Sequence, residues 1–375
     1  MDLKEARYGA RDLTIDFVRG LCLPLMMMDH LRNHWLSIFT YRPLGFFCAA
    51  AVFVFLSGFS LAKHYTRYLG APDPFSIYRH IWRRAAEAYG LHLCVTLITL
   101  TLAVYAPFGR EVEDAVNRPW KALMSSALLN SDAPLLEFLP MYIFFLLCTP
   151  WILKRFQSGH EKAILGPSFL IWLAAQFGYS LPMPPFTTVF DSAGWQLLYV
   201  TSLYLGFTQA TQPLERPQES KSLNLALFGS MTALVMLRHA EIFGLDAFAQ
   251  AIPAWWIDRS HAGPLVILNL YLWVAFLWLV PGPLLRLARQ GRVFVAVGHY
   301  ALPVFAWQVL LFYVFMSWFP QLYRYSILEQ ALVVCFAVVC LVFPVSLFLT
   351  TAQPKSRPIA LPPIGEGATR LFEGR

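Results

Sequence analysis

The chain has few charged residues for its length. Only 14% of its 375 residues are Asp, Glu, Lys or Arg, whereas soluble domains contain about 25%. Hydrophobic residues make up 57% of the chain, and the mean hydropathy is +0.52. This deficit of charge excludes an ordinary soluble domain and places the chain among membrane proteins.

Long basic runs are also absent, although the net charge is +7. The Lys and Arg residues stand in short segments between apolar stretches, so nucleic acid is excluded as a partner. The six cysteines lie in apolar segments and have neither the spacing of a zinc site nor that of a disulfide framework. We therefore expect buried, apolar cysteine side chains and no metal. No cleavable signal pattern is present, so we expect the first apolar segment to be retained as the first span.

In place of charge, the chain has apolar segments long enough to cross a bilayer, which takes about 20 residues. Ten segments qualify, at about 13–37, 44–63, 86–106, 135–153, 163–181, 193–211, 223–241, 263–281, 293–316 and 327–350. With a cytoplasmic N-terminus, most Lys and Arg residues fall on the inner side, as membrane proteins prefer. The sequence therefore predicts an all-α polytopic membrane protein with about ten transmembrane helices and both termini in the cytoplasm. Residues 1–353 form one transmembrane domain, and 354–375 a loose cytoplasmic tail.

The first apolar segment contains ionisable residues on one helical face. Arg19 and His30 are eleven residues apart, so on a helix they lie within about 20° of each other and about 16 Å apart along the axis. Asp16 can pair with Arg19 across one turn, whereas Asp29 projects about 100° away from His30. A charge at bilayer depth costs roughly 3 kcal/mol, so this stripe indicates a functional site. Gly20 lets another chain or a ligand approach the backbone closely.

His30 is suited to act as a general base, because the unperturbed pKa of histidine lies near neutrality. A structural interpretation also exists for each residue of the stripe. Asp16 and Arg19 would then be interfacial residues, and His30 a hydrogen-bonding group between helices.

Three arginines follow the second span in a segment that we predict to be a cytoplasmic loop. Arg79 and Arg83 share a helical face, and Arg84 follows directly. Clustered guanidinium groups suit phosphates, because each binds phosphate oxygens in a bidentate fashion. The alternative is an ordinary basic anchor on an interfacial helix.

Two other features fit either function or packing. Ser57 and Gly58, in the second span, are typical of closely packed membrane helices. The outer loops contain Asp191, Trp195 and His261 among other aromatic and acidic residues. Such side chains can hold a sugar, but they are also typical of the aromatic belt at a membrane surface.

Taken in order, these pieces resemble a known family. The run Asp16-x-x-Arg19-Gly20, followed by Asp29-His30, Ser57-Gly58-Phe59 and the arginine segment, resembles the acyltransferase-3 superfamily. The resemblance is closest to its OpgC branch, the membrane acyltransferases that succinylate osmoregulated periplasmic glucans. Further matches to that branch lie at Leu139–Tyr142, Trp195–Leu198, His261–Pro264 and Gly298–Phe305.

The resemblance implies a multi-pass enzyme of the bacterial inner membrane, in contact with membrane lipid. It would move an acyl group, succinyl in the OpgC branch, from cytoplasmic acyl-CoA to a periplasmic glucan or another carbohydrate. The catalytic site would contain His30, Arg19, Asp29 and Asp16. The coenzyme A phosphates and the acyl path would be served by Arg79, Arg83, Arg84, Ser57, Gly58 and Phe59.

Some alternatives remain open within this interpretation. His30 would act as a general base or would carry the acyl group as an acyl-imidazole. The chain departs from many superfamily members at Ala306-Trp307-Gln308, where they have a histidine. A succinyl group would need an extra cation beside its pocket, and Arg32 and Arg42 are candidates. An oligomer is compatible with the sequence. The alternative function is a transporter of a glycan or an anion along the polar stripe, although the paired broken helices typical of transporters are not evident.

Overall fold

The computed structural model describes residues 12–31, 35, 37–105, 117–130, 137–181, 190–213, 220–240, 244, 246–319 and 321–351. Within these ranges 80% of the residues are helical and none lies in a strand. The predicted all-α class is therefore confirmed. The predicted cytoplasmic tail at 354–375 and the candidate Arg32 lie outside the described residues.

Each predicted apolar segment overlaps at least one helix. The helices, in chain order, are α1 (Leu13–His30), α2 (Ser37–Thr40), α3 (Ala49–Tyr65), η2 (Thr66–Tyr68), α4 (Ser76–Tyr105), α6 (Pro119–Ala127), α7 (Phe138–Gln157), α8 (Lys162–Ala175), α9 (Ser192–Thr211), α10 (Lys221–Arg238), α12 (Asp246–Gln250), η3 (Ala254–Trp256), α13 (Pro264–Leu279), α14 (Pro281–Gln290), α15 (Arg292–His299), α16 (Ala301–Trp318), η4 (Leu322–Arg324) and α17 (Ile327–Thr351).

Among the described residues, four helices are long and apolar enough to cross a membrane. They are Ser76–Leu102 of α4, Phe138–Gln157, Ala301–Trp318 and Ile327–Val345 of α17. A fifth candidate is the pair α13 and α14, which is bent by 85° at Val280. The predicted span at 293–316 is divided at Tyr300 into α15 and α16. The molecule is a helical membrane protein, while the count of about ten spans and the orientation of the termini stay predictions.

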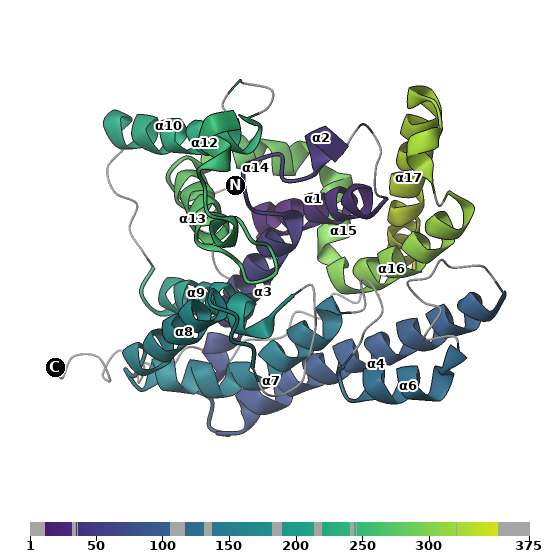
Figure 1. Ribbon diagram of the computed structural model, residues 1–375. Coiled ribbons are helices and arrows are strands. Elements are labelled where there is room, and N and C mark those ends of the chain that lie inside the picture. The colour runs from purple at the N-terminus through teal and green to yellow at the C-terminus, as the bar shows by residue number, and fades with distance from the viewer. Residues whose placement is uncertain are drawn as a thin grey trace.

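Helix α1 occupies the centre of the bundle (Figure 1), where it contacts α3, α14, α15, α16 and α17. Its crossing with α15 is very close. A Cβ atom on Gly20 would lie 1.8 Å from the carbonyl oxygen of Phe294, and one on Gly298 would lie 1.7 Å from that of Asp16. The close approach that Gly20 permits is therefore used by a neighbouring helix of the same chain.

Helices α3 and α9 pack in a similar way. A Cβ atom on Gly58 would lie 2.0 Å from the Ser202 hydroxyl oxygen, and one on Gly206 would lie 2.2 Å from the carbonyl oxygen of Phe59. Glycines of this kind let membrane helices approach at backbone distance. The two close crossings connect α15, α1, α3 and α9 through the middle of the molecule.

The crossing of α1 and α15 predicts that Gly20→Ala destabilises the protein. The added methyl group meets backbone rather than a movable side chain, and overpacking of this kind costs about 1–3 kcal/mol. Gly90→Ala is the matched control, because a Cβ on this helical glycine meets nothing within 4 Å and alanine favours a helix by up to about 1 kcal/mol. In thermal unfolding measured in detergent, only Gly20→Ala should have a lower midpoint than the wild type. Equal midpoints for the two variants would contradict the interpretation.

Candidate active site

Arg19 is buried between α1 and α3. Its Nη2 atom donates hydrogen bonds to the Leu56 carbonyl oxygen and to the Ser60 hydroxyl, each at 3.0 Å. Its Nη1 atom lies 3.6 Å from a carboxylate oxygen of Asp16, the pair that the sequence predicts. The guanidinium therefore joins α1 to α3 one turn from Ser57.

Asp16 lies deeper still and is only 2% exposed. Besides Arg19, its carboxylate faces Nδ1 of His299, the last residue of α15, at 3.9 Å. The backbone crossing at Gly298 brings this imidazole to α1. The N-terminal end of the stripe thus becomes a three-helix polar cluster of Asp16, Arg19, His299 and Ser60.

His30, at the other end of α1, meets a different helix. The side-chain amide of Gln308 in α16 lies 3.4 Å from Nδ1 of His30, and the Phe312 ring packs edge-on at 6.0 Å between centroids. Gln308 is 1% exposed. It faces His30, the predicted catalytic residue.

The backbone of α1 defines how the Gln308 amide is oriented. With its nitrogen toward Leu23 and its oxygen toward Met27, the amide donates to the Leu23 carbonyl at 3.3 Å and accepts from the Met27 N–H at 3.1 Å. The same oxygen then faces Nδ1 of His30. In this arrangement Nδ1 carries the imidazole proton, and Nε2 is the basic nitrogen.

Asp29 points away from His30, as the helical geometry predicts. Its carboxyl group lies beside the Thr40 hydroxyl and within the electrostatic field of two arginines, Arg42 and Arg259. Arg42 follows α2, and Arg259 belongs to the loop before α13. Three segments distant in sequence therefore meet at the C-terminal end of α1.

The three arginines near residue 80 do not form a loop cluster. They lie within the first turns of α4, which begins at Ser76, so the shared helical face of Arg79 and Arg83 is confirmed and the cytoplasmic position of the segment stays a prediction. Arg79 and Arg83 pair with Asp73 at 3.0 Å and with Glu87 at 3.1 Å on the exposed side. The helix extends this far because Arg83 and Glu87 form an i,i+4 ion pair and no glycine or proline interrupts residues 76–89.

Arg84 faces another direction. Its Nε atom donates to the Tyr142 hydroxyl at 3.3 Å, and the phenol groups of Tyr65 and Tyr199 are close. The difference follows from the 100° step between adjacent helical residues. Of the three arginines, only Arg84 therefore points to the interface of α4 with α7, while Arg79 and Arg83 face outward.

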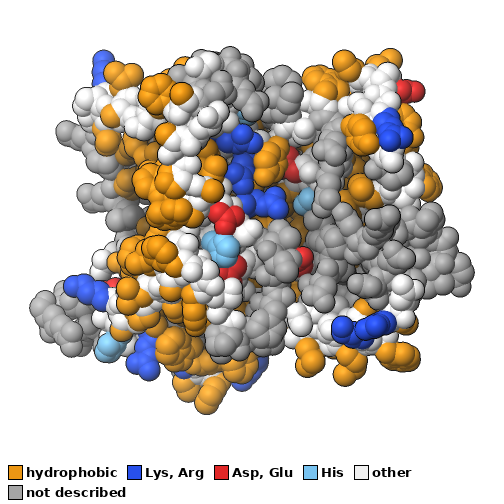
Figure 2. All heavy atoms as spheres, in the orientation of Figure 1, with side chains coloured by type: hydrophobic (Ala, Val, Ile, Leu, Met, Phe, Trp, Pro, Cys, Tyr) orange, Lys and Arg blue, Asp and Glu red, His pale blue; other side chains and the backbone are white. Residues whose placement is uncertain are grey.

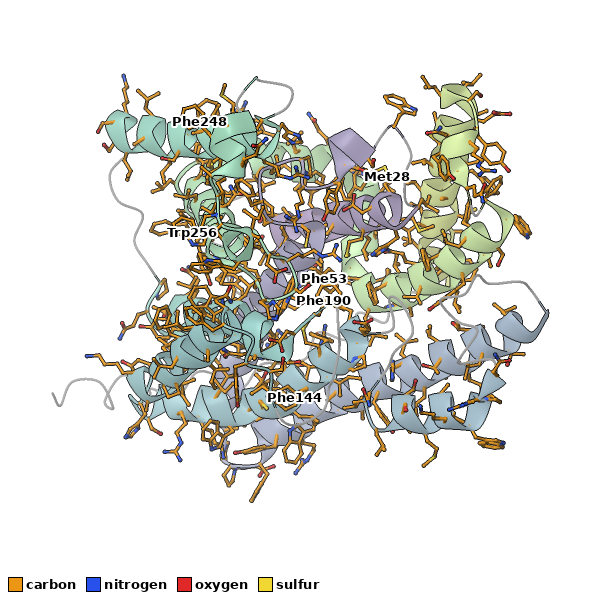
Figure 3. The ribbon with its side chains drawn as sticks, viewed as in Figure 1. Met28, Phe53, Phe144, Phe190, Phe248 and Trp256 are labelled. Carbon is orange, nitrogen blue, oxygen red and sulfur yellow. The ribbon has the colours of Figure 1, made fainter. Side chains whose placement is uncertain are left out.

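Aromatic rings pack together where α3, α7, α16 and the residues before α9 meet. Phe138 of α7 packs on Phe53, Phe190 and Phe305 at centroid distances of 5.9, 5.7 and 5.2 Å. Figure 3 shows Phe53 and Phe190 together near the middle of the molecule. Phe59, in contrast, stacks on Phe55 at 6.2 Å. Arg259 lies over the Phe190 ring at 5.9 Å, so the aromatic cluster reaches the loop before α13.

The loop before α13 also holds a histidine between two carboxylates. His261 Nδ1 hydrogen-bonds Asp258, and its Nε2 lies 3.9 Å from Asp191, the N-cap of α9. Burial raises the pKa of Asp191. Partial burial acts the same way on Asp258, but hydrogen bonds from His261 and Ser260 lower the pKa of this carboxyl below its ordinary value.

The sequence did not reveal three of these contacts. Gln308, Ser60 and Arg259 join the site from helices or loops far away in the chain. The available signal for Gln308 was its polarity within an apolar segment. No group of three or more His, Cys, Asp or Glu side chains in the described ranges is arranged to hold a metal.

The fold and the site together define a helical membrane protein with a buried polar centre on its first helix. The family model for the OpgC protein matches residues 11–352, and the chain belongs to that family. This membership implies an acyltransferase-like role in glucan modification. No curated protein and no solved structure matches the chain.

The contact between Gln308 and His30 predicts an effect on pH dependence. In Gln308→Glu, a carboxylate beside Nδ1 favours the protonated imidazole, so the basic form of His30 needs a higher pH. The acidic limb of the pH–activity profile should therefore rise by about 1 unit or more. Gln330→Glu, a buried glutamine of α17, is the control. An unmoved limb in Gln308→Glu, or an equal shift in both variants, would contradict the contact.

Proposed function

We propose that the protein is an acyl-CoA-dependent O-acyltransferase of the bacterial inner membrane. It moves an acyl group, succinyl in this proposal, from cytoplasmic acyl-CoA to a periplasmic glucan or a related carbohydrate. The observation that supports the proposal is the contact of the Gln308 amide with Nδ1 of His30. This contact leaves Nε2 as the basic nitrogen at the C-terminal end of α1. Family membership supplies the coarse activity.

The transfer needs one base and one acyl donor. His30 Nε2 removes the proton from a sugar hydroxyl while the hydroxyl oxygen attacks the thioester carbonyl carbon. The new C–O bond forms, the C–S bond breaks, and the imidazolium returns its proton to the departing thiolate. The products are an ester and free coenzyme A, so atoms and electrons balance without another reactant.

A two-step route uses the same residue. His30 Nε2 attacks the thioester carbonyl carbon first, the C–S bond breaks, and a coenzyme A thiolate and an acyl-imidazolium form. The sugar hydroxyl oxygen then attacks the acyl carbon, the C–N bond breaks, and the hydroxyl proton passes to the thiolate. The Gln308 oxygen opposite Nδ1 suits both routes, because it stabilises the imidazole when a proton or an acyl group is on Nε2. Trapping an acylated His30 would identify the two-step route.

The other residues have supporting roles in this proposal. Arg19 and Asp16 position α1 against α3 and α15, since their contacts are to these helices. Arg84 contributes to the donor site from the interface of α4 with α7. Arg79 and Arg83 bind the nucleotide phosphates, whose oxygens replace the carboxylates of Asp73 and Glu87 as their partners. The acyl arm follows α3 past Ser57, Gly58 and Phe59.

His30→Ala should abolish transfer while the protein still accumulates in the membrane. General acid–base catalysis contributes about 10²–10⁴-fold, so a loss of this size is expected. Membranes are incubated with labelled succinyl-CoA and glucan in the presence of an ionophore, and the product is identified by mass spectrometry. His160→Ala, an exposed histidine between α7 and α8, is the control. Near-normal transfer by His30→Ala would refute its catalytic role, and transfer that requires an ion gradient would favour the transporter.

A further inference from the structure

The region at the C-terminal end of α1 contains a buried arginine with unused hydrogen-bonding capacity. Arg42 is 8% exposed and donates through Nη1 to the Ile257 carbonyl oxygen at 3.3 Å, while its Nε atom is buried without a partner. Within the described part of the chain it forms no ion pair. A buried guanidinium is costly unless it is paired with an anion.

The backbone at Arg42 is held in an unusual conformation. Its φ angle is 56°, in the left-handed region that L side chains other than those of Asn and Asp rarely adopt. The turn that follows is fixed from α13: Asn269 accepts from the Phe46 N–H at 2.7 Å, and the Trp273 indole donates to the Leu44 carbonyl at 3.1 Å. Strain of this kind persists where the surrounding structure imposes it, and it is common at ligand sites.

A second arginine completes the positive region. Arg259 is half-buried over the Phe190 ring and, like Arg42, acts electrostatically on the Asp29 carboxyl. Figure 2 shows Lys and Arg side chains gathered near the middle of one face, beside acidic and histidine side chains. Both arginines act on the Asp29 carboxyl, and the neighbouring Asp258 and Asp191 carboxyls are engaged by His261, so this region can accept an anion.

Orphaned polar atoms gather in the same region. The Arg42 Nε and Asn269 Nδ2 atoms are buried without a hydrogen-bond partner, whereas the Thr40 hydroxyl and the Asp29 carboxyl act on each other. Buried polar groups are almost always satisfied in native structures, so these exceptions indicate a polar occupant. The two atoms are both donors, which suits an occupant that accepts hydrogen bonds.

We propose that Arg42 and Arg259 form a binding site for the distal carboxylate of a dicarboxylic acyl group carried to His30. The inference rests on the proposed function and identifies the residues that select the donor. The site lies at the same end of α1 as His30, because the carboxyl on which both arginines act belongs to Asp29, and the Phe190 ring of the aromatic cluster lies under Arg259. An apolar floor beside paired guanidinium groups suits a short carbon chain with a planar carboxylate at its end better than it suits a phosphate.

Donor selectivity tests this site. Membranes containing wild type or Arg42→Gln are supplied with succinyl-CoA and acetyl-CoA in competition, and the two esters are quantified by mass spectrometry. The ratio of succinyl to acetyl transfer should fall at least about tenfold in Arg42→Gln, because a site built to pair with a charged group discriminates strongly. Arg324→Gln, in the exposed η4 segment, is the matched control and should keep the wild-type ratio. An unchanged ratio in Arg42→Gln would overturn the proposal.

A second pair of variants covers the case in which Arg42→Gln fails to fold. Arg42→Lys keeps the charge but loses the bidentate geometry, and Arg259→Gln removes the other arginine. Both should lower the same ratio, and Arg42→Lys should do so less than Arg42→Gln. Wild-type ratios in both variants would refute the site, provided that each protein elutes as a single species in size-exclusion chromatography.

Binding measured without transfer separates this proposal from the proposed function. Succinate should raise the melting temperature of the purified wild-type protein more than equimolar acetate does, and Arg42→Gln should lose this difference. If the wild type transfers no acyl group but still shows this pattern, the proposed function fails and the anion site stands. Stabilisation by inorganic phosphate but not by succinate, or by neither anion, would overturn the carboxylate site.

Discussion

The arrangement of the molecule depends on the contact between the backbones of α1 and α15 at Gly20 and Gly298. Neither position has room for a side chain, because each would direct a Cβ atom onto the carbonyl oxygen of the opposite helix. At this separation the Asp16 carboxylate reaches His299. Because α1 is central, its contact with α15 also determines where its C-terminal end meets α16 and the loop before α13.

Such a central helix would be unstable if its charges were left alone in an apolar interior. Arg19 is instead surrounded by oxygen atoms from Asp16, Leu56 and Ser60, which lie on two helices. An ion pair buried in this way gains little net stability over an apolar pair, since desolvation offsets most of its Coulomb energy. Its effect is on specificity, because any other rotation of α1 would bury the guanidinium without these acceptors.

Periodicity was sufficient to find the stripe on α1, since Asp16, Arg19 and His30 were placed on one face from spacing alone and the pair of Asp16 with Arg19 exists. It was insufficient where helices begin or break. The start of α4 at Ser76 and the division at Tyr300 depend on packing between distant segments. The partners of the stripe were equally hidden, because Gln308 is 278 residues from His30 and nothing local to either residue indicates that they meet.

The glutamine at position 308 has a physical reason in the backbone of α1. Its amide contacts two backbone groups of that helix, Leu23 C=O and Met27 N–H, in the turn that begins beside Pro24. An amide has both a donor and an acceptor, so it can bind both groups and still turn its oxygen to Nδ1 of His30. A neutral histidine has one donor and one acceptor nitrogen on opposite sides of a rigid ring, which makes this threefold contact unavailable to it. The same side chain therefore binds the backbone of α1 and orients the imidazole, which links the position of His30 to the helix that carries it.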